Sequence, residues 1–246
     1  MYIHEKIYEK AKEKVKDFVI TDVRIGLSYI AVELNEERLG LSYSFTKELP
    51  VASCNISDMA GSIIGKDADY LLNKMYSYDL LESALGIATA NAILNINLPT
   101  EDMDILDTNR INVEDNVVMI GFFGPIISRL KNNVKKLTIC ERDKKLDVLP
   151  DYAAYFELSS CDVAIISATT LINKTINNLM DRIKNAHTVV VLGATTTMNR
   201  EIFRDTPITH LCGVCITDTE KVKQVVSQAG GTKALKPYTR KVCIGC

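Results

Sequence analysis

The sequence predicts an α+β first half followed by an α/β second half with a mostly parallel sheet. Before residue 96, strand-like segments come first and helical patterns follow them. After residue 116, short continuous apolar runs alternate with helical patterns. A polar stretch without a sustained period, residues 97–116, separates the two patterns and is typical of a domain linker. We therefore expect two domains, at residues 1–100 and 112–246.

The first half begins with a helical pattern over residues 3–17, where apolar side chains recur at every fourth position from Ile3 to Val15. Strand-like segments and then two further helical patterns follow this helix. The expected strands are residues 20–27, 29–34 and 39–44, and the expected helices are residues 57–75 and 78–95.

The second half carries the pattern of a parallel sheet covered on both faces. Its expected strands are the apolar runs at residues 117–121, 136–140, 163–167, 188–193 and 211–217. Its expected helices are residues 126–130, 171–183 and 219–228. This alternation predicts a doubly wound α/β domain.

Composition limits the classes of partner. The formal net charge is −2, which argues against a generic nucleic-acid surface or an anionic membrane surface, because both require a basic excess. The charged N-terminus lacks the apolar region of a signal peptide. The longest apolar stretch, residues 80–96, contains Glu82, Asn91 and Asn95, so it predicts a buried helix and no membrane span. We expect a cytoplasmic protein with reduced cysteines, and a homodimer is the common default.

The first two strands of the second half end at residues suited to a ligand. Ligands of doubly wound sheets bind at the carboxyl ends of the strands. The first strand runs into a turn with Gly121, Phe123 and Gly124, where the glycines allow close backbone approach. The second ends at Glu141, twenty residues beyond Gly121, where an acid can accept hydrogen bonds from ribose hydroxyls. The alternative for Glu141 is an ion pair with Arg142 or a lysine.

The next two strands also end at small or hydroxyl-bearing residues. These are Thr169, Thr170, Asn173 and Thr175 after the third strand, and Gly193, Thr195 and Thr196 after the fourth. Helix capping alone explains each of them. Taken together, they favour a shared pocket at this edge of the sheet.

Asn91 lies within the apolar helix expected at residues 78–95. Because an unsatisfied buried amide costs about 1–3 kcal/mol, its side chain must find partners. Two alternatives are open: the amide contacts a neighbouring backbone, or it faces a cleft between the domains and contacts ligand.

Two Cys-x-x-Cys pairs, Cys212 with Cys215 and Cys243 with Cys246, are candidate metal ligands. Four thiolates bind zinc or an iron–sulfur cluster. However, Cys212 and Cys215 lie in an expected strand, where residues three apart point to opposite faces. A four-cysteine site, a role for the tail pair alone and no role at all remain open.

Several segments of the chain resemble the heavy-metal chelation family over roughly residues 5 to 232. They are LLESALGIATANAIL at residues 80–94, VVMIGFFGPII at 117–127, TICER at 138–142, ATTLINKTINNLM at 168–180 and VVVLGATTT at 189–197. The resemblance implies an enolase N-terminal-like domain joined to a Rossmann-like domain. It also implies a site in the cleft between them, lined by Asn91, the turn 121–124, Glu141, Thr169, Asn173, Thr175 and the turn 193–196. Ala194 and Thr195 depart from the expected proline and serine.

Three functions follow from these observations. The first is binding of a small molecule, a metal or a metal chelate in metal homeostasis or in the assembly of a metal cofactor. The second is an enzyme acting on a nucleotide-like or pterin-like molecule, with Glu141 as its anchor. The third is a redox or iron–sulfur accessory protein that uses the cysteine pairs. A transition metal and an iron–sulfur cluster are the candidate cofactors.

Overall fold

The structure is a computed structural model, and it describes residues 1–35, 37–48, 57–99, 102–108, 110–143 and 148–246. The first half contains a three-stranded antiparallel sheet in the order β1 (Ile20–Ile25), β2 (Tyr29–Leu34) and β3 (Arg38–Tyr43). Its helices are α1 (Ile3–Lys12), α2 (Asp69–Leu72) and α3 (Leu80–Leu94). The predicted strands and the first and last predicted helices of this half are therefore confirmed.

The predicted helix at residues 57–75 is largely wrong. Residues 57–68 form turns, and helical structure starts only with α2 and the short 3₁₀ helix Asn73–Tyr76. Gly61 and Gly65 have φ angles of 79° and 84°, which a right-handed helix does not tolerate. The apolar spacing of this segment instead reflects its packing, since Met59 and Ile63 belong to the main core.

Helix α3 is the central element of the first half. Asp79 caps it by accepting a hydrogen bond from the Glu82 backbone N–H at 2.9 Å, and thirteen of its fifteen residues are buried. It packs directly on β3, because Gly40 leaves room for the helix backbone: a Cβ at this position would lie 2.0 Å from the Ala88 carbonyl oxygen. This close contact presents one face of α3 to the small sheet.

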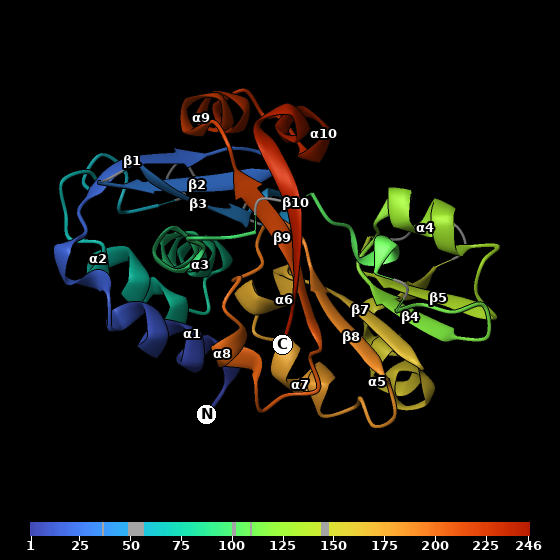
Figure 1. Cartoon of the computed structure of the whole chain (residues 1–246). Helices are drawn as coiled ribbons and strands as arrows, with labels where there is room; N and C mark the ends of the chain where they lie inside the picture. Colours follow the sequence, from blue (N-terminus) through green and yellow to red (C-terminus); the bar gives the residue numbers. More distant parts are fainter. Residues whose placement is uncertain (36, 49–56, 100–101, 109, 144–147) are drawn as a thin grey trace.

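The second half contains a seven-stranded sheet in the order β10-β9-β8-β7-β4-β5-β6, parallel except for the β9–β10 pair (Figure 1). Its strands are β4 (Asn116–Ile120), β5 (Lys136–Glu141), β6 (Leu149–Pro150), β7 (Val163–Ser167), β8 (Thr188–Leu192), β9 (His210–Ile216) and β10 (Thr239–Gly245). The five predicted strands are confirmed, whereas β6 and β10 were not predicted. The winding direction reverses between β4 and β7, which places the topological switch point between these neighbouring strands.

Short helices connect the strands of the large sheet. They are α4 (Gly124–Leu130), α5 (Ala154–Glu157), α6 (Thr169–Ile172), α7 (Ile176–Met180) and α8 (Arg200–Phe203). The single helix predicted at residues 171–183 is broken between α6 and α7. Lys174 has a φ of +63°, and the Asn173 side chain accepts a hydrogen bond from the Thr175 backbone N–H at 3.1 Å. This local turn competes successfully with a continuous helix.

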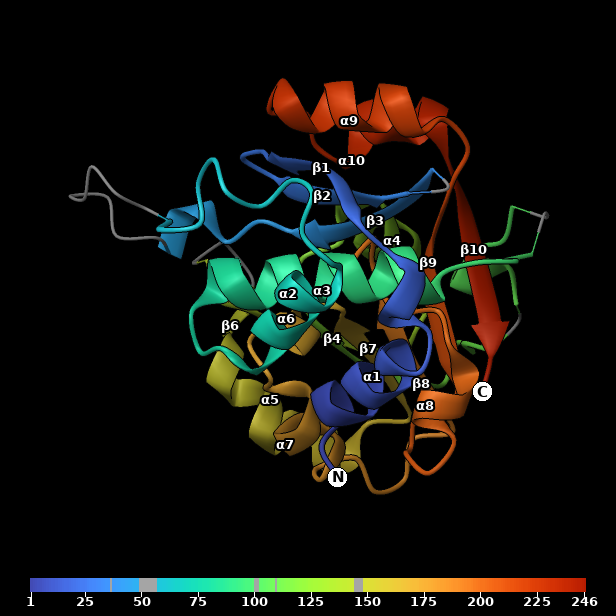
Figure 2. The ribbon, with the colours of Figure 1, turned by 90° about the vertical axis from the view of Figure 1, so that its left-hand side faces the viewer.

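Two C-terminal helices, α9 (Thr219–Ser227) and α10 (Thr232–Leu235), pack against the sheet of the first half (Figures 1 and 2). Strand β2 therefore has a helix on each face. Tyr29 and Ala31 contact the α9 side, while Ile30 and Val32 belong to the main core on the α3 side. The buried Lys223 on α9 strengthens the contact through ion pairs to Glu33 at 2.9 Å and Asp22 at 3.7 Å.

The main hydrophobic core extends through both halves. It joins Ile3 and Ile7 of α1 and most of α3 to Ile166 of β7 and Ile202 of α8. Within the described residues, no helix has the length and apolar character that a membrane crossing requires.

Candidate functional site

A cavity of about 630 Å³ lies at the switch point of the large sheet. Residues that follow β4, β5, β7 and β8 form one side of it. Residues of the first half, among them Tyr29, Tyr43 and Phe45, form the other side, and Thr232 of α10 contributes as well. We call this cavity the cleft.

Gly121 lines the cleft at the point where β4 ends. Its φ of +98° favours glycine, and a Cβ here would lie 2.9 Å from the Ser167 Cβ atom. The Gly121 backbone N–H donates to the Cys140 carbonyl of β5 at 2.9 Å. The ends of β4, β5 and β7 are therefore held close together at this point.

Hydroxyl groups line the wall beyond β7. The Ser167 and Thr169 hydroxyls lie 2.9 Å apart, and the Thr170 hydroxyl donates to the Ser167 carbonyl at 2.7 Å. The Thr175 hydroxyl donates to Asn173 Oδ1 at 2.7 Å. Because these groups already bond one another, the wall is held in place before a ligand arrives.

The turn after β8 is held by Asn91 of α3 and by Asn95, the residue that directly follows this helix. Asn91 Nδ2 donates to the carbonyls of Leu41 and Thr195, both at 2.9 Å, and Asn91 Oδ1 accepts from the Thr197 hydroxyl at 2.7 Å. Asn95 Nδ2 donates to the Thr196 carbonyl at 2.9 Å. The Asn91 amide thus satisfies the first of its two alternatives, contact with neighbouring backbone, and joins β3 to the turn.

Glu141 ends β5 beside Gly121, at the position that the spacing predicted. Its Oε1 atom accepts hydrogen bonds from the backbone N–H groups of Arg142 at 2.7 Å and Asp143 at 3.2 Å. The neighbouring Cys140 also lines the cleft, and burial raises the pKa of its thiol to about 11. The Cys140 thiol is therefore protonated at neutral pH.

Seven aromatic side chains line the cleft: Tyr29, Tyr43, Phe45, Phe122, Phe123, Tyr152 and Tyr155. The rings of Tyr43 and Phe45 contact edge to face, with centroids 5.1 Å apart. The Tyr29 hydroxyl lies 2.7 Å from the Thr232 hydroxyl and so connects β2 to α10. Such surfaces suit the planar or apolar parts of an organic ligand.

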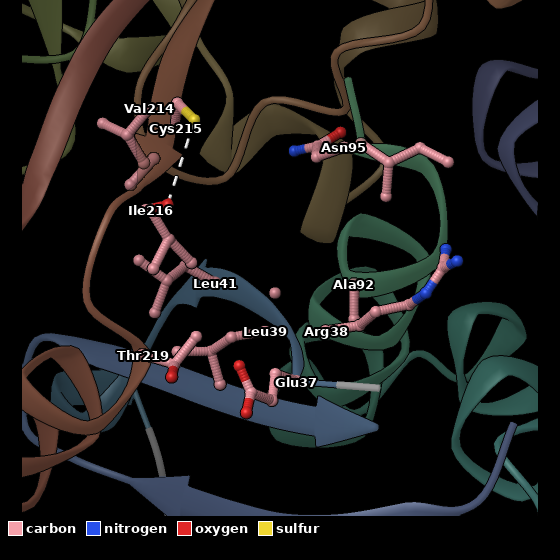
Figure 3. A pocket seen from close by; sticks show the side chains of 13 residues that line it. Glu37, Arg38, Leu39, Leu41, Ala92, Asn95, Val214, Cys215, Ile216 and Thr219 are labelled. Atoms are coloured by element: carbon pink, nitrogen blue, oxygen red, sulfur yellow. Dashed lines mark hydrogen bonds between the residues drawn. The ribbon is translucent and has the colours of Figure 1, made fainter. Parts of the chain in front are cut away.

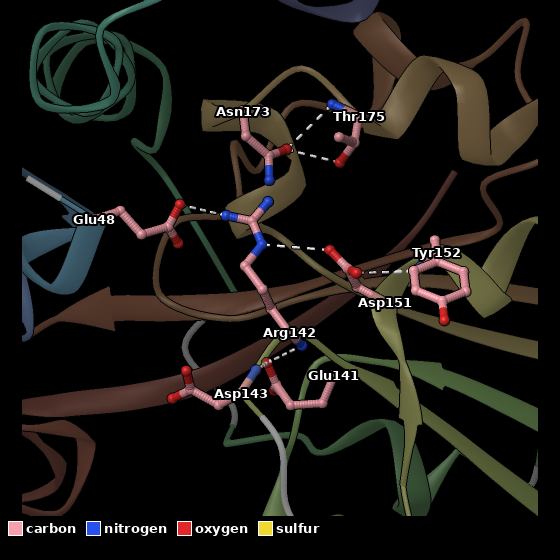
Figure 4. A network of polar contacts seen from close by, with 8 residues as sticks. All are labelled: Glu48, Glu141, Arg142, Asp143, Asp151, Tyr152, Asn173 and Thr175. Atoms are coloured by element: carbon pink, nitrogen blue, oxygen red, sulfur yellow. Dashed lines mark hydrogen bonds and ion pairs between the residues drawn. The ribbon is translucent and has the colours of Figure 1, made fainter.

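Ion pairs at the mouth of the cleft join the two halves, and Figure 4 shows the pair between Glu48 and Arg142. Lys47 pairs with Asp143 at 2.6 Å. Beside it, Arg142 pairs with Glu48 through Nη1 and with Asp151 through Nε, the latter at 3.4 Å. Lys47 and Glu48 belong to the 3₁₀ helix Thr46–Glu48 of the first half, whereas Arg142 and Asp143 follow β5.

Most of the residues predicted to bind a ligand line this one cleft. They are Gly121, Phe123, Glu141, Thr169, Thr170, Asn173, Thr175, Gly193 and Thr195. Three others do not line it: Asn91 is 1% exposed, Thr196 bonds the Cys212 carbonyl at 3.0 Å, and Gly124 begins α4. The ligand-binding role of all twelve stays a prediction.

Sequence reasoning missed Arg142 as a cleft residue, along with the contributions of the first half and of α10. Arg142 was considered only as a partner for Glu141. Its position one residue after a strand end could have drawn attention to it. Tyr43 and Thr232 carry no local signal, because only the packing of distant segments brings them to the cleft.

A second cavity of about 180 Å³ lies between β3, the C-terminal end of α3 and β9 (Figure 3). Cys215 lies at one side of it, with its thiol 3.9 Å from the Ile216 carbonyl oxygen, and Glu37 lies at the opposite side. The Arg240 guanidinium contacts the Cys215 sulfur at 3.6 Å.

The four-cysteine metal site is not formed. Cys212 faces Cys243 across the β9–β10 ladder and forms a disulfide with it, which also corrects the expectation of reduced thiols for this pair. Cys215 faces Arg240 farther along the ladder, and Cys246 lies beyond its other end. Strand β9 continues through Gly213 without a turn, so residues three apart stay on opposite faces. In the described part of the chain, no three His, Cys, Asp or Glu side chains cluster closely enough to hold a metal ion.

Comparison with known proteins agrees with the resemblance seen in the sequence. Residues 104–244 match the family DUF364 and residues 8–94 match the family DUF4213, each described as "Putative heavy-metal chelation". An uncharacterized protein of Methanocaldococcus jannaschii is 30% identical, and the alignment covers 97% of this chain and 96% of that protein.

Two crystal structures of DUF364-family proteins of unknown function share the fold. The protein from Pyrococcus horikoshii has a TM-score of 0.86 at 24% identity, over 99% of this chain and 100% of that chain. The protein from Desulfitobacterium hafniense has a TM-score of 0.84 at 20% identity, over 99% of this chain and 98% of that chain. At these identities the likeness concerns the fold alone. The chain belongs to the DUF364 family, whose description is "Putative heavy-metal chelation".

Proposed function

We propose that the cleft binds a small organic ligand that carries a metal ion, and that the protein acts as a metal-chelate binding protein in metal homeostasis or cofactor assembly. The observation that carries the proposal is the cleft itself, a cavity of about 630 Å³ at the switch point of the large sheet. The family description supports metal as the cargo. We propose a cytoplasmic location for this role.

The lining favours a chelate over a bare ion. A bare heavy-metal ion is held by several thiolate, imidazole or carboxylate donors that converge on one point. The cleft is lined mainly by aromatic rings, hydroxyls and backbone groups. Its carboxylates already have partners: Glu48 and Asp151 pair with Arg142, Asp143 pairs with Lys47, and Glu141 accepts from backbone N–H groups. A ligand that brings its own metal donors fits such a surface.

A second candidate is an enzyme or binding protein for a nucleotide-like molecule. Glu141 favours it, because an acid at the end of the strand beside the first glycine turn accepts hydrogen bonds from ribose hydroxyls in Rossmann-like domains. Its Oε1 atom is held by backbone N–H groups, which fixes the carboxylate at the edge of the cleft.

Thermal unfolding of the full chain against a ligand panel tests both candidates. The panel contains Ni²⁺, Co²⁺ and Zn²⁺ salts, the same metals complexed with citrate or histidine, and adenine nucleotides. A ligand that binds the folded chain raises the unfolding temperature, and the rise grows with the ratio of the ligand concentration to its Kd. The proposal expects stabilisation by a metal complex that exceeds the effect of the metal salt and of the chelator alone.

Glu141→Gln separates the candidates. It should abolish stabilisation by nucleotides if Glu141 anchors a ribose, and Glu157→Gln is the matched control because Glu157 pairs with Lys136 outside the cleft. Stabilisation by nucleotides alone would replace the chelate proposal with the second candidate. If metal salts stabilise the chain as much as their complexes do, and nucleotides do not stabilise it, the result would contradict both candidate functions.

A further inference from the structure

The Arg142 guanidinium has three nitrogens, and two of them are engaged at the mouth of the cleft. Nη1 donates to Glu48 of the first half, and Nε donates to Asp151 at 3.4 Å (Figure 4). Within the described part of the chain, Nη2 has no hydrogen-bond partner. This nitrogen and Nη1 form the edge with which arginine binds an oxyanion through two parallel hydrogen bonds.

Asn173 lies across from this guanidinium on the wall beyond β7. Its Oδ1 atom accepts from both the Thr175 backbone N–H at 3.1 Å and the Thr175 hydroxyl at 2.7 Å. These two bonds fix the orientation of the amide, and Figure 4 shows its nitrogen directed toward the Arg142 guanidinium. Two donors cannot bond each other, so this part of the cleft presents hydrogen-bond donors with the acceptor still to be supplied.

We propose that Arg142 and Asn173 form an oxyanion subsite that takes a carboxylate or phosphate group of the cleft ligand. Glu48 is then an internal carboxylate that engages one edge of Arg142 until the ligand group replaces it. The inference rests on the proposed function in one respect: the oxyanion belongs to the ligand that the cleft binds.

The exchange of Glu48 for a ligand group is energetically small. The side chains of Arg142 and Glu48 are 43% and 34% exposed, and ion pairs this accessible to solvent contribute little net stability. The exchange is also necessary, because three negative charges around one guanidinium (the incoming anion, Glu48 and Asp151) would repel one another. A bidentate contact with Nη1 and Nη2, joined by the Asn173 amide, compensates for the lost ion pair.

Isothermal titration of the full chain with two probes, inorganic phosphate and malonate, tests the subsite. Arg142→Gln should weaken binding at least about tenfold, since hydrogen bonds to charged groups contribute strongly. Arg142→Lys keeps the positive charge but loses the two parallel N–H donors, so its affinity for the probes should lie between those of the wild type and Arg142→Gln. Asn173→Asp, which replaces the donors with a carboxylate, should weaken binding too. The probe that binds more tightly identifies the oxyanion as phosphate or carboxylate.

Glu48→Gln gives the distinctive result. Removing the competing carboxylate should tighten probe binding about two- to fivefold, the range expected for an exposed ion pair. Glu157→Gln, which removes a carboxylate outside the cleft, should leave it unchanged. Equal affinities of the wild type, Glu48→Gln and Arg142→Gln for both probes would overturn the proposal, and so would weaker binding by Glu48→Gln.

The same variants keep this inference distinct from the proposed function. If a metal complex stabilises the wild type and Arg142→Gln equally, and neither probe depends on Arg142, the proposed function stands and the subsite fails. If both probes depend on Arg142 and no metal complex binds, the subsite stands and the chelate proposal fails.

Discussion

Asn91 shows how one polar side chain can organise the cleft without lining it. Its amide group is buried between β3 and the turn after β8, and it satisfies two carbonyls and one hydroxyl there. The sequence left its role open because burial and hydrogen bonding are equally compatible with both alternatives. Its hydrogen-bond partners Leu41 and Thr195 lie 50 and 104 residues away in the sequence, so no local pattern around Asn91 reveals them.

Asn91→Ala should destabilise the protein by about 3 kcal/mol, because it leaves buried polar groups of Leu41, Thr195 and Thr197 without partners. Chemical denaturation measures the change. Asn112→Ala, at an exposed position, should shift the free energy of unfolding by less than about 0.5 kcal/mol. Equal effects of the two substitutions would contradict the assigned role of Asn91.

Cys161 gives the stability a dependence on alkaline pH. Burial raises the pKa of its thiol from 9.0 to about 11, so the folded state disfavours the thiolate. This contribution is complete below pH 9 and is lost as the pH rises toward 11, because the unfolded chain releases the proton first.

The difference in the free energy of unfolding between the wild type and Cys161→Ala should therefore be constant below pH 9. Above pH 9 it should shrink by up to about 1.4 kcal/mol per pH unit. Urea unfolding at several pH values measures it. Val189→Ala, a buried substitution without a titrating group, should give a flat difference, and a flat difference for Cys161→Ala as well would refute the account.

At the scale of elements, α9 stabilises a sheet that belongs to the other half of the chain. Its Val226 is fully buried, and its backbone lies so close to Gly26 that a Cβ there would be 2.2 Å from the Val226 carbonyl oxygen. Val226→Ala should cost about 2 kcal/mol by denaturation, whereas the exposed Gln224→Ala should have little effect. A negligible cost for Val226→Ala would mean that α9 does not hold this sheet.

Local patterns predicted the elements better than their partners. The buried strands β7 and β8 were recognised because continuous apolar runs are typical of a covered parallel sheet. Strand β10 was missed, since residues 239–245 mix charged and apolar side chains as edge strands do. The break at Lys174 was missed because helical spacing continues on both sides of it.

At the scale of the whole molecule, we propose that the two halves, residues 1–100 and 112–246, fold as one unit. The main core joins α1 and α3 to the large sheet, and α9 returns to cover the small sheet. No local periodicity reports such contacts, so the sequence alone predicted separate domains. By contrast, the nine predicted residues do line one cleft, because the carboxyl ends of parallel strands lie at the same edge of a sheet. This topological rule can be applied from the sequence alone.

Calorimetry should accordingly give a single unfolding transition, whose calorimetric and van't Hoff enthalpies agree. Val226→Ala should lower its midpoint without splitting it. Two resolved transitions, one of them unaffected by this substitution, would show that the halves unfold independently.

Native mass spectrometry of the full chain mixed with metal–citrate and metal–histidine complexes tests the central claim most directly, because it weighs what is bound. The account predicts one equivalent of an intact complex, metal and chelator together, on the wild type. Thr169→Tyr, which puts a bulky ring into the cleft, should bind none, and Ser159→Tyr, an exposed control outside the cleft, should bind as the wild type does. Bare metal on the wild type, no complex on any variant, or equal binding by Thr169→Tyr would contradict the claim.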